Sequence, residues 1–443
     1  MLVAIVVTTP WVEAHVFAYA ARRMTFHLVH EPGGSSVSAT AGPYDLRLGY
    51  AKLRSATESS QRVGFRIVAH AKSSWLESTA MKMGLPPIYR EKSQAGLEIL
   101  DDRGQPMYQA LTPRRVYRDY ASIPQLIVQS LLFAENRELL DASTPYRNPT
   151  VEWDRLARAG FDFALYSVAR RHPVSGGSTV ATQLEKLRHS AGGQTASTGD
   201  KLRQMFSASL RAYLNGPRSL AARKQTVSDY INSLPLAAIP GHGEVTGLAD
   251  GLQAWFGADV DDLNRLLDLS DDAAESTGCM HEKALAYREA LSLLLAAKKP
   301  STCLASGQTA LTHRVDAYLR LLAKSGVISG TLRDAALDTK LESRAIQRQQ
   351  VSTPDFAGRK GIDAVRAGLL PLLGVQDLYG LDRFDLAVQA TLDQPVTEAV
   401  SHTLQSVSNA VPANEPSLFG EHLLNPATAN WRGEQNNRTH PPC

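Results

Sequence analysis

Apolar residues recur at helical spacing from Pro124 to about Leu341, and this stretch therefore predicts a mainly helical region. In its first segment Leu126, Ile127 and Leu131 fall on one face, which leaves Glu135 one turn beyond the buried stripe and near the end of the helix. The same spacing predicts further helices over residues 201–214, 220–233, 281–297 and 312–325.

The first 41 residues divide into an apolar segment and a linker. Residues 1–30 have a helical pattern, and residues 31–41 are rich in Gly and Ser. Residues 1–12 are apolar but fall far short of the ~20 residues that cross a bilayer, and they lack a basic signal-peptide start. Two interpretations stay open: a buried element, or a truncated membrane anchor that forms a membrane-proximal helix.

Residues 42–110 predict a small α+β module, because strand-like runs at 65–69 and 96–100 are followed by a turn at 101–104. The helical domain that follows is expected to cover residues 111–341.

The C-terminal part predicts less regular structure. Residues 342–410 have the character of a linker segment, with a strand near 381–391 and a helix at 394–408. Residues 411–443 are polar and rich in Asn and Pro, and we expect them to be disordered.

Composition narrows the function classes without choosing one. The chain has 443 residues, 43% hydrophobic and 21% charged, which is ordinary for a globular protein. A net charge of +3 gives no electrostatic case for nucleic acid as a partner. The three cysteines and scattered histidines show no metal-ligand spacing, and isolated thiols are the simplest interpretation.

The most informative run is Ser-Gly-Gly-Ser-Thr-Val-Ala-Thr-Gln-Leu-Glu-Lys at residues 175–186. A small-residue loop that opens an amphipathic helix presents free backbone N–H groups, which suit an anion. Glu135 precedes this run by about forty residues, and an acid within reach of an anion site can act as a base on the attached substrate.

Glu135 and this run resemble the first two motifs of glycosyltransferase family 51, the peptidoglycan glycosyltransferases of class A penicillin-binding proteins. Members typically contain Glu-Asp-x-x-Phe-x-x-His-x-Gly, followed by Gly-Gly-Ser-Thr-Ile-x-Gln-Gln-Leu-x-Lys-Asn. Weaker matches follow in the family's order at Lys224 with 230–232, at 255–257 and at 293–301. The resemblance covers about residues 96–340.

This resemblance implies a lysozyme-like glycosyltransferase domain, mainly α, preceded by the small α+β module. It implies polymerisation of lipid II into glycan strands, by inverting transfer with a lipid-linked pyrophosphate as the leaving group. Glu135 would be the general base. The substrate contacts would be Arg137, Gly176, Gly177, Ser178, Thr179, Gln183, Lys186, Arg203, Arg211 and Lys224.

The resemblance also implies a setting. We expect the protein at the periplasmic face of the bacterial inner membrane, in contact with the membrane surface, lipid II and the growing strand. The chain contains no Ser-x-x-Lys, so we expect it to lack the transpeptidase domain of the bifunctional enzymes and to have a separate transpeptidase as a partner. No protein metal site is predicted, although the family leaves a divalent cation (Mg²⁺) open as a cofactor.

Several departures from the family pattern keep alternatives open. Asn136 replaces the Asp of the first motif, Leu139 replaces its Phe, and no His follows. The family's second acid should fall at Ser207. One alternative is therefore a degenerate homologue that binds lipid II or a cell-wall partner without turnover. A lysozyme-like hydrolase is a third reading, which the pyrophosphate-binding motif disfavours.

Overall fold

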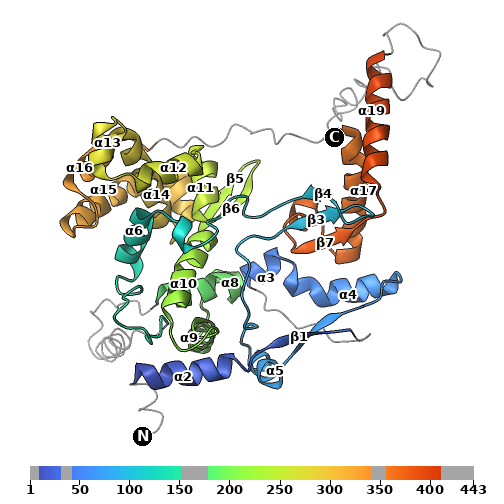
Figure 1. Ribbon diagram of the computed structural model, residues 1–443, viewed down its shortest axis with the longest axis horizontal. Helices are drawn as coiled ribbons and strands as arrows, with labels where there is room; N and C mark the ends of the chain where they lie inside the picture. Colours follow the sequence, from blue (N-terminus) through green and yellow to red (C-terminus); the bar gives the residue numbers. More distant parts are fainter. Residues whose placement is uncertain (1–8, 31–41, 151–177, 342–355, 411–443) are drawn as a thin grey trace, which may run out of the picture.

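The computed structural model describes residues 9–30, 42–150, 178–341 and 356–410. Figure 1 shows a helical body on one side and a smaller sheet-containing part on the other. The mainly α prediction, with a small α+β module, is confirmed.

The helical body is organised around α14 (Met280–Ala296), whose side chains are buried on nearly every face of its C-terminal half. It packs against helices that come before and after it in the chain. These partners are α6 (Gln125–Glu135), α11 (Leu248–Phe256), α12 (Val260–Asp268), α13 (Asp271–Ser276), α15 (Gln308–Lys324) and α16 (Gly330–Asp338). One continuous apolar core joins them. Short helical turns, η2 (Tyr120–Ser122) and η4 (Ser301–Ser306), precede α6 and α15.

A second group of helices lies beside this body. It comprises α8 (Val180–His189), η3 (Ala191–Gly193), α9 (Thr198–Ala212) and α10 (Leu220–Ser233), and α8 packs on both α9 and α10. A hairpin of β5 (Pro235–Ile239) and β6 (Gly243–Thr246) connects α10 to α11. The helices predicted at 201–214, 220–233, 281–297 and 312–325 are all present, with ends moved by up to four residues. For α9 the earlier start has a cause, since the Ser197 side chain caps the helix.

The N-terminal segment is part of the fold. Helix α2 (Pro10–Ala21) packs on α9, while β1 (Phe26–Val29) pairs antiparallel with β2 (His70–Ser73). The prediction of helix through residue 30 is thus wrong for β1. The predicted strand at 65–69 is also wrong, because pairing begins only at His70. Within the described ranges, no helix combines the length and apolarity needed to span a bilayer.

The remaining elements form the smaller part at the right of Figure 1. Its helices are α3 (Pro43–Arg47), η1 (Tyr50–Lys52), α4 (Leu53–Arg62), α17 (Phe356–Leu373), α18 (Leu378–Leu381) and α19 (Gln394–Ala410), while α5 (Trp75–Lys82) lies next to β1 and β2. Its sheet has the order β4 (Pro106–Gln109), β3 (Leu97–Leu100), β7 (Leu386–Gln389).

This sheet joins two segments that the sequence analysis assigned to separate units. Strand β3 pairs in parallel with β7, and Leu97 and Ile99 are fully buried against Ile362, Leu369 and Leu381. Part of the segment predicted as a linker therefore completes the α+β module. The predicted strand at 381–391 is shorter than expected. Its first residue, Leu381, ends helix α18, and β7 covers only Leu386–Gln389.

Candidate active site

Glu135 is the last residue of α6, as its position after the apolar stripe predicts. Only 11% of its side chain is exposed. Its carboxylate accepts a hydrogen bond from Gln183 Nε2 at 3.0 Å, and Lys298 Nζ lies 2.8 Å from the other oxygen. The carboxylate is therefore held by α8 on one side and, on the other, by Lys298, the second residue after α14.

Gln183 is itself fixed, because its Oε1 accepts a hydrogen bond from the hydroxyl of Tyr230 at 3.2 Å. Tyr230 lies on α10 and is 4% exposed. Burial, followed by the charge of Glu135, raises the pKa of Tyr230, so this phenol stays protonated and remains a donor. The relay Tyr230–Gln183–Glu135 thus sets the orientation of the acid from a packed position.

The start of α8 is a capped helix end. Thr179 accepts a hydrogen bond from Thr182 N at 3.3 Å, and Thr182 Oγ1 accepts one from Thr179 N at 2.9 Å. This reciprocal capping uses two of the N–H groups that the sequence analysis offered to an anion. Gly176 and Gly177 lie outside the described residues, so their predicted contacts stay predictions.

Two lysines are associated with α8: Lys201 contacts its capped start, and Lys186 belongs to its last turn. Lys201 Nζ donates to Ser178 Oγ at 2.8 Å. Burial, followed by the charge of Lys186, lowers the pKa of Lys201, which places the two ammonium groups in one electrostatic environment. Because Gln183 and Lys186 are three residues apart, they are neighbours on one face of α8. Helix α8 thus lies beside an acid of α6, carries the cation Lys186, and has the cation Lys201 of α9 at its start.

The other predicted substrate contacts have different surroundings. Arg137 stacks on the ring of Phe133, with 4.0 Å from its guanidinium carbon to the ring centroid. Arg203 pairs with Asp200, and Lys224 Nζ lies 5.2 Å from the ring centroid of Tyr120. None of these contacts brings the three residues to Glu135, and their roles in binding stay predictions.

Ser207 occupies the position where the family pattern predicts an acid, and it is fully buried. Its hydroxyl donates to Glu185 Oε2 at 2.8 Å. The other oxygen of Glu185 lies 2.7 Å from Arg211 Nε, so the two side chains form an ion pair. The N–H group of Arg211 Nε does not point at that oxygen closely enough for a hydrogen bond. A carboxylate is thus present beside Ser207, supplied by α8 rather than by α9.

Arg211 is held from a second side by the segment before β3. Its guanidinium donates to the carbonyls of Pro87 and Tyr89, both at 2.8 Å, and lies 2.7 Å from Glu91. Its side chain is only 15% exposed, though it still lines a cavity of about 310 Å³ with Glu185. The predicted contact of Arg211 with phosphate would have to be made within this cavity.

Glu91 is the centre of a buried charge cluster that also contains Asp45, Arg188, His189 and Arg211. Burial lowers the pKa of His189, but the carboxylates of Glu91 and Asp45 outweigh burial and raise it from 6.5 to about 9. Burial raises the pKa of Glu91, yet the surrounding cations outweigh it and hold that pKa well below its usual range. The cluster joins α3, the 85–95 segment, α8 and α9.

Three residues of the site were not indicated by the sequence, namely Lys298, Lys201 and Glu185. Lys298 lies inside the segment 293–301, and the weak resemblance of that segment to the family is the one sequence feature that could have indicated it. Glu185 stands at a variable position of the second motif, so no pattern could have indicated it. In the part of the chain that the structure describes, no three His, Cys, Asp or Glu side chains are grouped as metal ligands.

The site therefore contains a buried acid at the end of α6, oriented from a capped helix that also carries a cation. Residues 103–322 match the family model Transgly, whose description is Transglycosylase. This part of the chain belongs to glycosyltransferase family 51. No curated protein matches the chain.

Proposed function

We propose that the chain polymerises lipid II into glycan strands, with Glu135 as the general base. One observation carries the proposal: Gln183 orients the Glu135 carboxylate, and Lys186 lies one turn further along the same face of α8 with Lys201 beside it. A base for the incoming sugar and cations for a departing pyrophosphate are what this transfer needs.

The steps follow from these positions. Glu135 takes the proton of the acceptor hydroxyl as its oxygen attacks the anomeric carbon of the donor. The bond from that carbon to the pyrophosphate oxygen breaks, and the leaving group carries away the electron pair. Lys186 and Lys201 stabilise the charge that develops on the pyrophosphate, and attack opposite the leaving group inverts the configuration. Lys298 and Gln183 keep the carboxylate aimed during this step.

Incubation with labelled lipid II tests the proposal. Glycan strands as the product support it, and free muropeptides would indicate hydrolysis instead. Asn136 and Ser207 favour a second candidate, a homologue that binds lipid II without turnover. Unchanged substrate that remains bound to the protein would establish that candidate and overturn the first. The same assay with EDTA and with excess Mg²⁺ shows whether a divalent cation takes part.

We also propose that the protein works at the periplasmic face of the inner membrane, with α2 and α9 toward the lipid. Large apolar side chains on these helices are exposed, including Trp11 at 54%, Tyr19 at 62% and Phe206 at 51%. Phe17 packs on Phe206 with 5.5 Å between ring centroids, so the two helices present one surface. Trp and Tyr favour the level of lipid headgroups.

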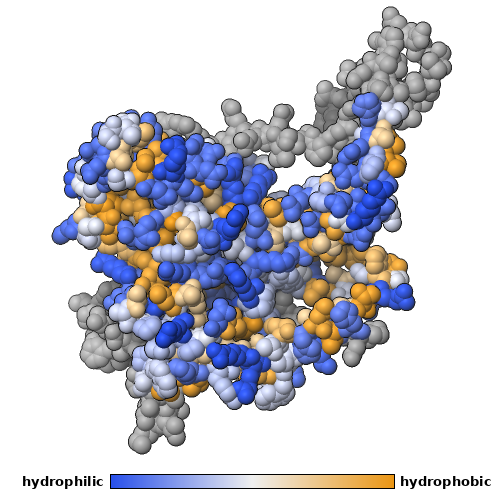
Figure 2. All heavy atoms as spheres, in the orientation of Figure 1, coloured by the Kyte–Doolittle hydropathy of each residue, from blue (hydrophilic) through white to orange (hydrophobic). Residues whose placement is uncertain are grey.

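Further exposed apolar residues extend this region. Leu28, Val63 and Phe65 are each at least 60% exposed, and Figure 2 shows hydrophobic side chains at the surface near α4 and β1. The double change Trp11→Glu and Tyr19→Glu should reduce binding to liposomes, while Val396→Glu with Val400→Glu, which changes two exposed apolar residues of α19, should not. Equal partitioning of all three proteins would remove α2 from the proposed membrane face.

A further inference from the structure

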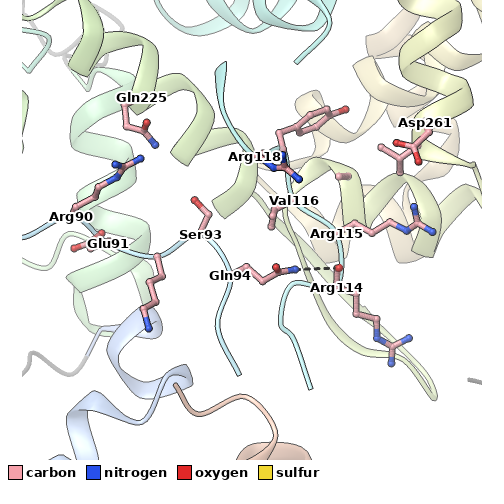
Figure 3. A pocket seen from close by; sticks show the side chains of 14 residues that line it. Arg90, Glu91, Ser93, Gln94, Arg114, Arg115, Val116, Arg118, Gln225 and Asp261 are labelled. Atoms are coloured by element: carbon pink, nitrogen blue, oxygen red, sulfur yellow. Dashed lines mark hydrogen bonds between the residues drawn. The ribbon is translucent and has the colours of Figure 1, made fainter. Parts of the chain in front are cut away.

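A basic cleft lies outside the Glu135 site. It encloses about 660 Å³ between the segment at 90–94, the segment at 114–118, α10 and the start of α12. Neither Glu135 nor Gln183, Lys186 or Lys298 lines it. Figure 3 shows Arg90 on one side of the hollow and Arg114, Arg115 and Arg118 on the other, with Ser93 and Gln94 between them.

Three of the four arginines of this cleft have no carboxylate partner in the described ranges, while the charge of Arg115 acts on Asp259. In the described ranges, no carboxylate comes within ion-pair distance of Arg90, Arg114 or Arg118, and all three are exposed. Arg115 donates from Nε to the neutral side chain of Gln253 at 2.8 Å. Three uncompensated guanidinium groups around one hollow repel each other, which favours an anion that neutralises them.

The acids that line the cleft do not supply that neutralisation. The Glu91 carboxylate is fully engaged by Arg188 and Arg211 on the far side of its segment. Asp261 is exposed on the rim, at the start of α12. Lys92, the remaining cation, already pairs with Asp385 at 2.9 Å. The free positive charge therefore belongs to the arginines.

The backbone that carries these arginines is fixed before any ligand arrives. Gln94 Nε2 donates to the carbonyls of Pro113 at 2.7 Å and Arg114 at 3.2 Å, which ties the two segments together (Figure 3). Asn232 of α10 bonds both the N–H and the carbonyl of Tyr117, at 2.9 and 2.8 Å. A preorganised cleft loses less entropy on binding than a flexible one.

From this arrangement we propose that the cleft binds a small polar molecule with two or more phosphate or carboxylate groups. The planar guanidinium fork matches both oxyanions with paired hydrogen bonds. A single negative charge would leave most of the arginine charge unbalanced, so the ligand is an oligoanion. The volume is within the ~300–1,000 Å³ usual for small-molecule sites. The proposal goes beyond the polymerisation chemistry, because it concerns a separate site.

Calorimetric titration of the full chain with tripolyphosphate and with propane-1,2,3-tricarboxylate tests this assignment. We expect saturable binding of at least one anion, and the tighter of the two identifies phosphate or carboxylate as the natural group. Arg90→Gln with Arg118→Gln should weaken binding at least tenfold. Arg90→Lys with Arg118→Lys should weaken it less, since it keeps the charge but loses the paired hydrogen bonds.

The matched control removes the same charge elsewhere. Arg314→Gln with Arg320→Gln changes two exposed arginines of α15, and its affinity should stay within twofold of the wild type. An equal loss in both double variants, or no saturable binding to the wild type at millimolar anion, would overturn the proposal. Should the cleft double variant not fold, Arg114→Gln alone takes its place. Glu135→Gln should bind the anion normally, so a failure of the polymerisation proposal remains distinguishable.

Discussion

Ser207 of α9 donates its hydroxyl hydrogen to Glu185 of α8, with 2.8 Å between the oxygens. This bond means that the carboxylate missing from position 207 is present a short distance away, on the neighbouring helix, and paired with Arg211. Loss of an acid at one position of a motif need not remove the acid from the folded domain.

Exchanging these two side chains tests the relationship. Ser207→Glu alone should destabilise the protein by ~1–3 kcal/mol, because it adds volume and a second carboxylate in a fully buried position. Glu185→Ser alone should also destabilise it, since Arg211 loses one partner. The double exchange should recover at least half of the summed loss, as measured by denaturant unfolding. Simple additivity of the two losses would mean that the positions are independent.

Replacement of the acid should abolish turnover. Glu135→Gln keeps the shape of the side chain but cannot take a proton, and loss of a general base lowers rates by ~10²–10⁴-fold. The rate of lipid II polymerisation measures the effect, while bound lipid II and the unfolding midpoint should change little. Glu138→Gln, three residues on and largely exposed, is the matched control. A Glu135→Gln protein as fast as this control would move the base elsewhere.

Lys298 should matter for rate more than for folding. It is 59% exposed and lies 2.8 Å from Glu135, so Lys298→Ala removes a positioning contact without opening the core. We expect kcat to fall ~10-fold with KM nearly unchanged, because the contact orients the acid rather than the substrate. The adjacent Lys299→Ala is the control. Identical kinetics for the two variants would leave Lys298 without a role in orienting Glu135.

The two lysines at α8 should govern affinity for pyrophosphate. Lys186→Ala and Lys201→Ala each remove one cation from the pair, and each should weaken binding of a soluble pyrophosphate analogue ~5-fold or more. The loss should shrink at high salt as screening increases. Lys324→Ala, at the distant end of α15, provides the comparison. Retention of full affinity by both variants would mean that the start of α8 is only a capped helix end.

Stability should fall in mild alkali because of His189. Its pKa is raised to about 9 in the folded protein, so its contribution is fully present below the unfolded value near 6.5 and is lost as the pH rises through 9. We expect the free energy of unfolding to drop by an amount on the order of 2 kcal/mol across this window. His189→Gln should flatten the profile between pH 6.5 and 9. A variant that keeps the same slope would assign the effect to another group.

The sequence predicted well those features that one segment determines. Apolar spacing alone placed Glu135 at the end of a buried helix, and the structure confirms that position. Contacts between segments were not accessible in this way. The bond from Ser207 to Glu185 depends on how α8 crosses α9, and Lys298 reaches Glu135 only because α14 ends beside α6. The spacing of apolar residues within one segment carries no information about which other segment it contacts.

The sheet of the smaller part likewise joins segments whose pairing no single segment predicts. The distance between these segments along the chain has a consequence for folding during synthesis. Strands β3 and β7 pair in parallel although they are about 290 residues apart in the chain. During synthesis β3 leaves the ribosome long before its partner, and the entire transglycosylase region is made in between. Closing so long a loop is slow. The hydrophobic edge of β3 therefore stays unpaired on the β7 side during synthesis, and folding of this protein should depend on chaperones that hold unfolded chains.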